Sequence, residues 1–457
     1  MKLYNTMSRR KEDFVPMDGK TATIYSCGPT VYGTASIGNL RAYIFTDILK
    51  RGLLLAGFGI KDVINTTDVG HLQSDADDGE DKIEVAARKA KLDPAAIAQQ
   101  YTDEFLRDCD ALNILRPKKL VPATSCVDKM IEHIAGLEKL GYTYITSDGV
   151  YFDSSKFERY WDMQGKPKEG KGDKAGARID MGEKRNAHDF ALWKFTPPTA
   201  LQKWDSPWGV GCPGWHIECS AIIRKHLGDT IDIHTGGIDH IPIHHTNEIA
   251  QSEALTGKTF ARFWMHNEFM KVDGTKMSKS LGNVYTLPQL AKRGFTPMAF
   301  RYFVLGAHYR TILNFTFEAL EGAQNAYNNL VKEVFKHYHA TTHTPVTNDD
   351  FATAILDDLN TPRALAAIWE LLREKPNRGV YDLIVKFDKT LGLGLEAAVS
   401  VKIIVNEIPT SIKELAEKRF AAKQKKDFTA ADKLRAEVQS MGYEILDSKD
   451  SYEIKKI

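Results

Sequence analysis

TATIYSCGPTVYGTASIGNLRAYIFTDIL, residues 21–49, places a strand, a turn and a helix in direct succession. TATIYS (21–26) is rich in β-branched residues, which favours a short strand. A Gly/Pro turn follows, and then an apolar stretch from about Asn39 to Gly57 with the periodicity of a helix. The same alternation recurs along the first half of the chain, with strands expected at 61–68 and 230–236 and helices at 79–108 and 244–255. It predicts a doubly wound, Rossmann-like α/β domain with a parallel sheet, in which ligands bind at the carboxyl ends of the strands.

The pattern changes twice along the chain, which predicts several structural units. A stretch with a probable hairpin (142–153) and a loop rich in Gly and Lys (165–178) interrupts the alternation, as an insertion would. From residue 316, apolar residues recur at intervals of three and four, which predicts a helical bundle. A β-branched segment then leads to a basic helix and a short tail. We expect a first catalytic half at 1–118, the insertion at 119–205, a second catalytic half at 206–262, a connecting region at 263–315, the bundle at 316–398 and a small C-terminal domain at 399–457.

Composition is that of an ordinary globular protein. The 457 residues are 43% hydrophobic and 26% charged, with a net charge of +1, so a nucleic-acid partner has to be sought in local patches. The chain contains no apolar run of the length that a membrane helix needs. The cysteines are odd in number and scattered, which is a poor disulfide framework and fits a reducing compartment: Cys27, Cys109, Cys126, Cys212 and Cys219. We expect a cytoplasmic protein, without a membrane segment, that is a monomer.

KMSKS (276–280) is the sharpest local motif. It places Lys276 and Lys279, with two hydroxyls, on a loop flanked by glycines. Such a loop can close over a triphosphate and stabilise charge that develops during phosphoryl transfer. For five residues alone, a solvated basic loop is the better interpretation, so the context decides.

That context is the turn before the first helix. Ser36-Ile37-Gly38-Asn39 follows a predicted strand and opens a predicted helix. Gly38 permits close approach of a nucleotide, and the amino terminus of the helix favours phosphate. On its own this is a weak signal.

Four scattered residues have the chemistry of a zinc site: Cys27, Cys219, His244 and Glu248. His244 and Glu248 are spaced i, i+4, so a helix places both on one face. Spacing alone does not establish a metal, because a lone Cys or His is more often a buried core residue. His240 and His245 are also close by, and we do not expect either to be a ligand.

Together these segments resemble one family. CGPTVY (27–32), NTTD (65–68), EKRNAHDFALWK (183–194), CPGWHIECS (212–220), GGIDH (236–240), IHHTNE (243–248) and KMSKSLGN (276–283) stand in the order found in cysteinyl-tRNA synthetases, which are class I aminoacyl-tRNA synthetases. The resemblance continues through HYRTILNF (308–315) into KDFTAADKLR (426–435). It therefore covers nearly the whole chain.

The resemblance implies an enzyme that uses ATP to activate L-cysteine and joins it to tRNA(Cys). It implies one zinc ion on the four residues named above, which selects the substrate thiolate, and magnesium with ATP. By position, the implied catalytic residues are Lys276, Lys279, Ser36 and Asn39, the implied ATP-binding residues are Gly38, Gly236, Gly237, Asp239 and Lys279, and the implied cysteine-binding residues are Thr67 and Trp215.

The basic helix near the carboxyl terminus is the candidate RNA-binding element. It carries Lys418, Arg419, Lys423, Lys425 and Lys426. Such a helix suits the phosphates and exposed bases of an anticodon stem and loop. The alternative is a solvated helix face.

The chain departs from the family at three places. Ser36 stands where the first signature has histidine, Thr246 stands between the two metal ligands where glutamate is common, and the tail lacks a Gly-Thr-x-Trp ending. Two alternative functions stay open. One is a cysteine ligase of mycothiol synthesis, which passes activated cysteine to an amino sugar, and the other is a non-catalytic RNA-binding paralogue.

Overall fold

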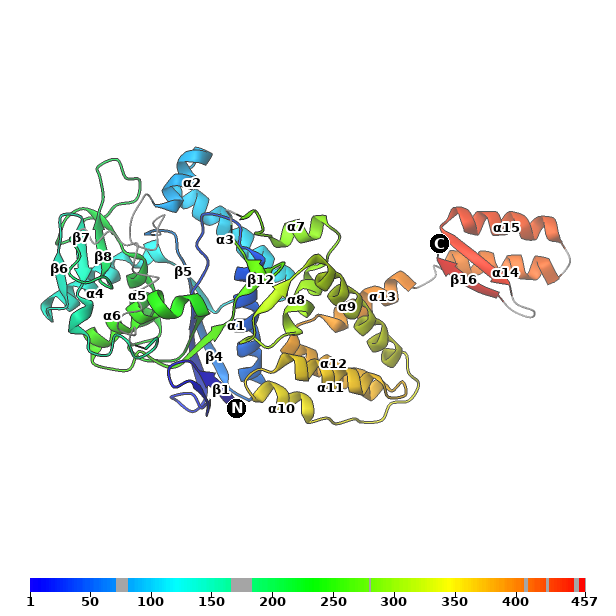
Figure 1. The fold of residues 1–457 in the computed structure, drawn as a ribbon. Coiled ribbons are helices and arrows are strands. Elements are labelled where there is room, and N and C mark those ends of the chain that lie inside the picture. Colours follow the sequence, from blue (N-terminus) through cyan, green and yellow to red (C-terminus); the bar gives the residue numbers. More distant parts are fainter. Residues whose placement is uncertain are drawn as a thin grey trace.

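The computed structural model describes residues 1–70, 81–165, 183–278, 281–406, 410–424, 427–447 and 452–456. A five-stranded parallel sheet lies at the centre of the catalytic part (Figure 1). Its strands are β3 (Thr21–Ser26), β4 (Gly59–Thr66), β5 (Lys119–Pro122), β10 (Ile231–Gly237) and β11 (Ala261–Asn267), in the order β11-β10-β3-β4-β5. The strand order reverses between β3 and β10, which is where a doubly wound sheet binds its ligand. The expected α/β class is confirmed.

Helix α1 (Ile37–Leu55) connects the sheet to the rest of the molecule. It begins at Ser36, whose side chain caps the first turn, and it is buried along most of its length. Ile44 and Ile48 lie one turn apart and belong to the large core that continues into the helical bundle. The helix therefore packs against the sheet on one side and the bundle on the other.

The expected single helix at 79–108 is wrong, since the structure has two helices there. They are α2 (Lys82–Ala90) and α3 (Pro94–Ala111). Lys91 ends the first helix in a left-handed conformation (φ 56°), and Asp93 caps the second, whose first residue is Pro94. Because proline has no amide proton and is favoured at the first helical position, the chain restarts here instead of continuing.

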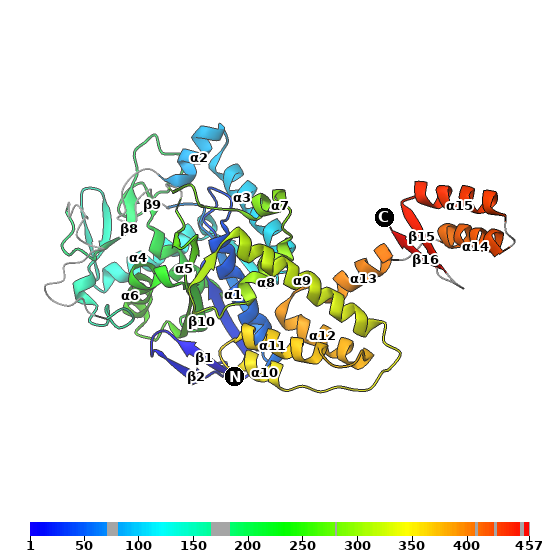
Figure 2. The same cartoon turned by 45° about the vertical axis from the view of Figure 1, so that its right-hand side comes forward.

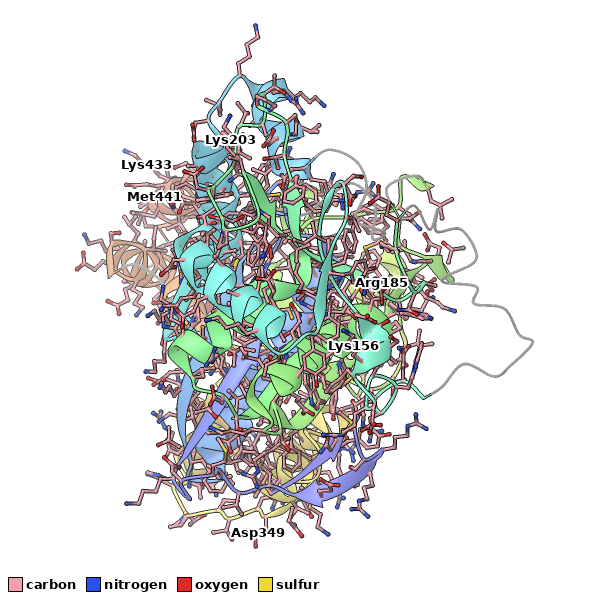
Figure 3. The ribbon with its side chains drawn as sticks, turned by 90° about the vertical axis from the view of Figure 1, so that its left-hand side faces the viewer. Lys156, Arg185, Lys203, Asp349, Lys433 and Met441 are labelled. Atoms are coloured by element: carbon pink, nitrogen blue, oxygen red, sulfur yellow. The ribbon has the colours of Figure 1, made fainter. Side chains whose placement is uncertain are left out.

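The insertion forms a separate antiparallel sheet in the order β6-β7-β8-β9. Its elements are η1 (Ala123–Cys126), α4 (Val127–Lys139), β6 (Thr143–Ile145), β7 (Gly149–Phe152), η2 (Ser154–Lys156), β8 (Phe190–Phe195) and β9 (Gly211–Pro213). The expected bounds of 119–205 need correction at both ends, because β5 pairs with β4 of the parallel sheet and β9 pairs with β8 of the insertion. Lys156 and Arg185 lie on its outer surface (Figure 3). The loop expected at 165–178 lies, after residue 165, outside the described residues.

The second catalytic half and its extension complete the site. They contain α5 (Trp215–His226), the short turns η3 (Ile238–His240) and η4 (Ile241–His245), α6 (Thr246–Thr256), α7 (Leu287–Lys292) and α8 (Pro297–Leu305). A small sheet joins β12 (Met270–Val272), β13 (Thr275–Lys276) and β14 (Leu313–Phe315), and a hairpin of β1 (Lys2–Asn5) and β2 (Arg10–Asp13) lies beside β11.

The helical bundle packs against α1 and α8. It consists of α9 (Phe317–Tyr338), α10 (Asp350–Leu356), α11 (Thr361–Leu372), α12 (Arg378–Leu391) and α13 (Leu395–Asn406). The domain boundary expected at residue 399 falls inside α13, in a segment rich in β-branched residues. Leu395 and Val399, one helical turn apart, are both fully buried in the core, and this packing outweighs the β propensity of the segment.

The C-terminal unit has a core of its own. It contains α14 (Thr410–Gln424), α15 (Phe428–Ser440) and the antiparallel pair β15 (Tyr443–Asp447) and β16 (Tyr452–Lys456). Ile412, Ala416, Val438 and Ile445 form that core. Figures 1 and 2 both show the unit set apart from the bundle. Among the described residues, no helix is long and apolar enough to cross a membrane.

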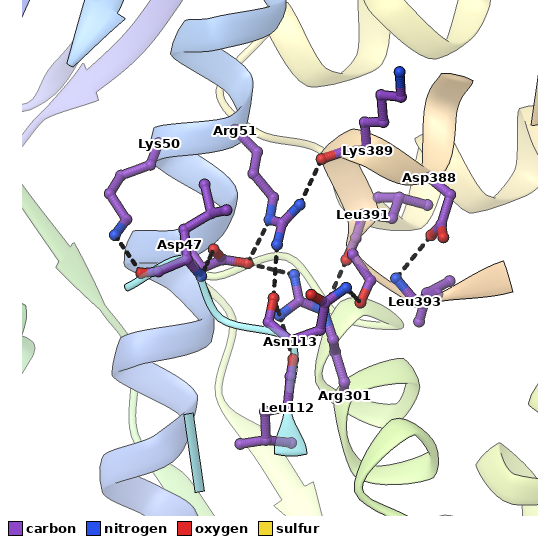
Figure 4. A network of polar contacts seen from close by, with 12 residues as sticks. Asp47, Lys50, Arg51, Leu112, Asn113, Arg301, Asp388, Lys389, Leu391 and Leu393 are labelled. Atoms are coloured by element: carbon purple, nitrogen blue, oxygen red, sulfur yellow. Dashed lines mark hydrogen bonds and ion pairs between the residues drawn. The ribbon is translucent and has the colours of Figure 1, made fainter. Parts of the chain in front are cut away.

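A buried polar network joins α1 to the bundle (Figure 4). The Asp47 carboxylate accepts hydrogen bonds from Arg51, at 2.8 Å, and from Arg301. Arg51 also donates to the carbonyl of Lys389, and Arg301 donates to the carbonyls of Leu391 and Leu112. The hydrogen bonds of two guanidiniums and one carboxylate thus link α1 and α8 to the C-terminal ends of α3 and α12.

Candidate active site and metal centre

A cavity of about 680 Å³ opens at the carboxyl ends of β3, β4 and β10. The described residues expected to be catalytic, to bind ATP or to bind cysteine all line it: Ser36, Gly38, Asn39, Thr67, Trp215, Gly236, Gly237, Asp239 and Lys276. Lys279 lies outside the described residues. The structure therefore brings segments from residue 27 to residue 278 to one cavity.

The floor of the cavity is formed where two segments of the chain, around Gly28 and Asn65, approach each other closely. A Cβ atom at Gly28 would lie 1.6 Å from the carbonyl oxygen of Asn65, so only glycine fits there. The Gly28 amide donates to Asn65 Oδ1 at 2.7 Å, and Asn65 Nδ2 donates to Thr67 Oγ1 at 3.0 Å. Thr67 Oγ1 in turn donates to the buried carboxyl of Glu218 at 3.0 Å. Because the hydroxyl proton of Thr67 is already used, Thr67 can offer the cavity only an acceptor.

The four expected metal ligands meet beside this floor. One donor atom each from Cys27, Cys219, His244 and Glu248 lies within 4.8 Å of the others. Cys219 Sγ is 3.5 Å from His244 Nε2, which is 3.0 Å from Glu248 Oε1. A tetrahedral ion with bonds of about 2.0–2.3 Å places its ligand atoms roughly 3.3–3.8 Å apart, so the spacing of this group suits such an ion.

The ionisation of the two thiols and the carboxylate supports a metal, while the pKa of His244, raised to about 10 by Glu248 and Cys219 against the effect of burial, means that this imidazole would also give up a proton. Burial raises the pKa of the Cys27 thiol and raises that of Cys219 further, so both hold their protons without a metal. Burial also opposes charge on Glu248, but His234 and His244 outweigh it and lower the pKa of that carboxyl to about 2. A divalent cation that displaced the thiol protons would compensate the buried negative charge. Two thiols, an imidazole and a carboxylate are a donor set that zinc takes.

The entrance of α1 is tied to the segment that carries KMSKS. The Ile37 amide donates to the carbonyl of Tyr285 at 2.9 Å, and a Cβ at Gly38 would lie 3.4 Å from the sulfur of Met277. Lys276 lies in the β12–β13 hairpin, opposite Lys271. The positive end of the helix and at least one lysine therefore face the same part of the cavity.

Ser36, one of the implied catalytic residues, uses its hydroxyl proton within the protein. Its hydroxyl donates to Asn39 Oδ1 at 2.6 Å and accepts from the Asn39 amide at 3.2 Å, and the Ser36 amide donates to Asn39 Oδ1 at 3.0 Å, which closes a capping box. A hydroxyl has one proton, so none is left for a ligand. The Asn39 side chain, whose oxygen is held by Ser36, keeps its amide nitrogen for the cavity.

Comparison with known proteins decides the family. Residues 13–325 match the model of the tRNA synthetases class I (C) catalytic domain. The chain is 43% identical to cysteine–tRNA ligase 1 of Burkholderia lata, over 98% of this chain and 95% of that protein. It is 41% identical to the cysteine–tRNA ligase of Treponema denticola over all of both chains, and 42% identical to that of Opitutus terrae over 100% and 99%.

This chain belongs to the cysteine–tRNA ligase family.

A more distant likeness agrees with the fold of this family. Mycobacterium tuberculosis methionyl-tRNA synthetase, solved in complex with methionyl-adenylate, superposes with a TM-score of 0.55 at 16% identity, covering 84% of this chain and 91% of that one. At that identity the match shows the fold alone. The family model and the similar cysteine–tRNA ligases, and not this match, confirm the resemblance drawn from the motifs and the class of enzyme.

In this member of the family, histidines that the sequence analysis did not assign surround the four candidate ligands. His244 Nδ1 lies 3.0 Å from His216 Nδ1, and His234 Nε2 lies 2.9 Å from Glu248 Oε2. His240 lines the cavity, and burial, followed by the nearby His244, lowers its pKa to about 4. The histidine density of HTGGIDHIPIHH (234–245) is the signal in the sequence that could have indicated this cluster.

The expected RNA-binding cations of this family member differ in their surroundings. Arg419 is buried, and its guanidinium forms a bidentate pair with Asp447, so it holds α14 to β15 and is not available to RNA. Lys423 lies 3.0 Å from the same carboxylate but is about two-fifths exposed, and Lys418 is exposed. Lys425 and Lys426 lie outside the described residues. Sequence position alone could not separate a buried pair from a free cation on the same helix.

Proposed function

We propose that this chain is a cysteine–tRNA ligase that converts L-cysteine and ATP to cysteinyl-adenylate and transfers the cysteinyl group to the 3′ end of tRNA(Cys). The observation that carries the proposal is the position of the Cys27, Cys219, His244 and Glu248 group. Three of these residues line the cavity whose other wall is the amino terminus of α1. A thiol-binding centre thus lies beside a phosphate-binding one.

The group would hold one zinc ion. When bound, zinc supplies an electrophile that prefers the thiolate of cysteine to the harder hydroxyl of serine. Trp215, stacked on His244 at 4.6 Å between ring centroids, would cover one side of the substrate. Thr67 Oγ1, which has only an acceptor left, suits the substrate ammonium. Selection by thiolate chemistry gives more discrimination than a hydrophobic pocket of this size could.

In the first step the cysteine carboxylate oxygen attacks the α-phosphorus of ATP, a new P–O bond forms, and the bond to the leaving pyrophosphate breaks. The amino terminus of α1, Asn39 Nδ2, Lys276 and Lys279 would stabilise the negative charge that develops on the phosphate oxygens. Gly236 and Gly237 leave room for the nucleoside, and the Asp239 carboxylate would accept hydrogen bonds from the ribose. Magnesium would accompany the triphosphate.

In the second step a hydroxyl of the terminal adenosine attacks the carbonyl carbon of the mixed anhydride, and AMP leaves. The tRNA would reach this site with its acceptor end while the C-terminal unit contacts the anticodon region. Lys418, Lys423, Lys425 and Lys426 would provide the phosphate contacts there.

Two assays on purified protein test this function. Cysteine-dependent exchange of pyrophosphate into ATP should occur without tRNA, and tRNA(Cys) should be charged while an amino sugar is not. Lys279→Ala should slow exchange roughly 100- to 1,000-fold, because it removes charge stabilisation from the transition state. Lys292→Ala, an exposed lysine at the end of α7, is the matched control and should be active. Absence of exchange in a folded, metal-containing wild-type protein would refute the proposal.

A further inference from the structure

A second set of four donors shares two members with the first. Donor atoms of Cys27, His234, His245 and Glu248 also lie within 4.8 Å of one another. Cys27 and Glu248 belong to both sets, whereas Cys219 and His244 belong only to the first and His234 and His245 only to the second. In the second set His234, His245 and Glu248 are fully buried, and Cys27 is partly buried.

The distances in the second set are close to those of a metal site, and Glu248 reaches the two histidines through different carboxylate oxygens. Cys27 Sγ is 3.4 Å from His245 Nε2, His245 Nε2 is 3.9 Å from Glu248 Oε1, and Glu248 Oε2 is 2.9 Å from His234 Nε2. The separations in the first set, 3.5 Å and 3.0 Å, fall in the same range. Both sets come near the roughly 3.3–3.8 Å that a tetrahedral ion imposes on its ligand atoms.

One ring of the second set, that of His245, is also oriented as a metal-binding histidine is, whereas His234 Nδ1 is buried without a hydrogen-bond partner among the described residues. A ligating histidine usually donates its other ring N–H to a neighbour, which fixes the direction of the ligating nitrogen. His245 Nδ1 lies 2.7 Å from His266 Nε2, and His266 Nδ1 lies 2.7 Å from Thr6 Oγ1. These bonds leave His245 Nε2 facing Cys27, just as the bond to His216 leaves His244 Nε2 facing Cys219.

The two sets differ in their access to substrate. Cys27, Cys219 and His244 line the cavity, whereas His234, His245 and Glu248 do not. His234 lies behind that wall, stacked on Trp264 with 4.6 Å between ring centroids. A metal held by the second set is therefore withdrawn from the place where a substrate thiol enters.

We propose that one zinc-class ion has two alternative positions in this chain: a substrate-facing position on Cys27, Cys219, His244 and Glu248, and a withdrawn position on Cys27, His234, His245 and Glu248. Two ions bound at once would have to share Cys27 and Glu248 as bridging ligands. Two divalent ions would also bring four positive charges against the three negative groups Cys27, Cys219 and Glu248 in a buried site. This proposal depends on the proposed function in one respect only, which is that the function makes L-cysteine the substrate thiol.

Cobalt(II), which reports its thiolate ligands by their charge-transfer absorption, tests the two positions in the full-length chain. Wild type should bind one ion, and added L-cysteine should change its spectrum. Cys219→Ala should still bind about one ion with about half of the thiolate absorption, and L-cysteine should no longer change it. Cys219→Ala/His245→Asn and Cys27→Ala should each lose the ion, because neither leaves a complete set. Cys212→Ala, a buried cysteine in neither set, should match wild type.

His244→Asn serves as a second variant should Cys219→Ala not fold, as judged by circular dichroism. It leaves the withdrawn set complete, so it should keep the ion and lose the response to L-cysteine. A folded Cys219→Ala or His244→Asn without metal, or two ions in wild type, would overturn the proposal. A wild type that holds one ion but shows no cysteine-dependent exchange would instead overturn the proposed function, so the two failures are distinguishable.

Discussion

The Ser36 hydroxyl is the first feature of the site with a measurable consequence. Its capping box with Asn39 stabilises the first turn of α1 and holds the Asn39 amide in place. Ser36→Ala should lower the free energy of unfolding by about 1 kcal/mol, as the loss of an N-cap does, and should slow cysteine-dependent exchange less than Lys279→Ala. Urea denaturation and exchange rates on the same preparations measure both effects.

Ser36→Thr is the matched control, because threonine can cap the same helix, and it should resemble wild type in both assays. Complete loss of exchange in a folded, zinc-loaded Ser36→Ala protein would contradict this assignment. Such a result would make the serine itself a principal catalytic group.

At the residue scale, the motifs named four residues, Cys27, Cys219, His244 and Glu248, whose donor atoms the structure places within 4.8 Å of one another, and their binding of a metal stays a prediction. The sequence did not predict the partner of each group. The pairing of Arg419 with Asp447, and of His245 with His266, depends on contacts between segments far apart in the sequence. No local pattern encodes these contacts.

At the scale of the elements, several strands were predicted closely, as for β3 and β10. The errors came from competing local and tertiary effects. Pro94 divides an otherwise continuous helical pattern into α2 and α3, and the burial of Leu395 and Val399 makes a helix of a β-branched segment. The first error could have been avoided by giving Asp93-Pro94 its usual meaning as a helix start. The second could not, because it depends on the bundle.

Asp447 holds the C-terminal unit together and should make it sensitive to acid. Arg419 donates hydrogen bonds to the Asp447 carboxylate and holds its pKa well below the usual range. Partial burial opposes this effect, and Lys423 adds to it. A group with a lowered pKa contributes stability above its unfolded value, near 3.9, and loses that contribution as the pH falls toward the folded value. The unit should therefore loosen below about pH 4.

Hydrogen–deuterium exchange of peptides from α14 and β15 in the full-length chain measures this loosening. Asp447→Asn should show at neutral pH the faster exchange that wild type shows in acid. Glu437→Gln, an exposed carboxylate on α15, is the control and should exchange as wild type does. Equal protection in Asp447→Asn and wild type at neutral pH would contradict the role of this pair.

At the scale of the whole molecule, the buried network around Asp47 joins the catalytic part to the bundle. Burial lowers the pKa of Arg301, and Asp47 opposes that effect by supplying the compensating charge. Asp47→Asn would remove the only carboxylate that the described residues show hydrogen-bonded to both buried guanidiniums, leaving the charge of Asp388 alone to offset theirs, and should cost about 3–5 kcal/mol of unfolding free energy. Denaturant unfolding followed by tryptophan fluorescence measures this loss.

Asp110→Asn provides the comparison, because Asp110 pairs with Arg116 at the surface and its loss should cost at most about 1 kcal/mol. A similar cost for the two variants would show that the Asp47 network does not hold the parts together.

The contact at Gly28 also bears on the natural variation that this protein can tolerate. Every amino acid that one nucleotide change can produce from a glycine codon carries a Cβ atom, and at this position that atom would lie 1.6 Å from the Asn65 carbonyl oxygen. Moving the carbonyl would shift Thr67, which lies two residues further along the same chain and lines the cavity. No single-nucleotide missense change at this codon therefore leaves the site intact, and selection should keep the codon free of missense alleles in any population that depends on this protein.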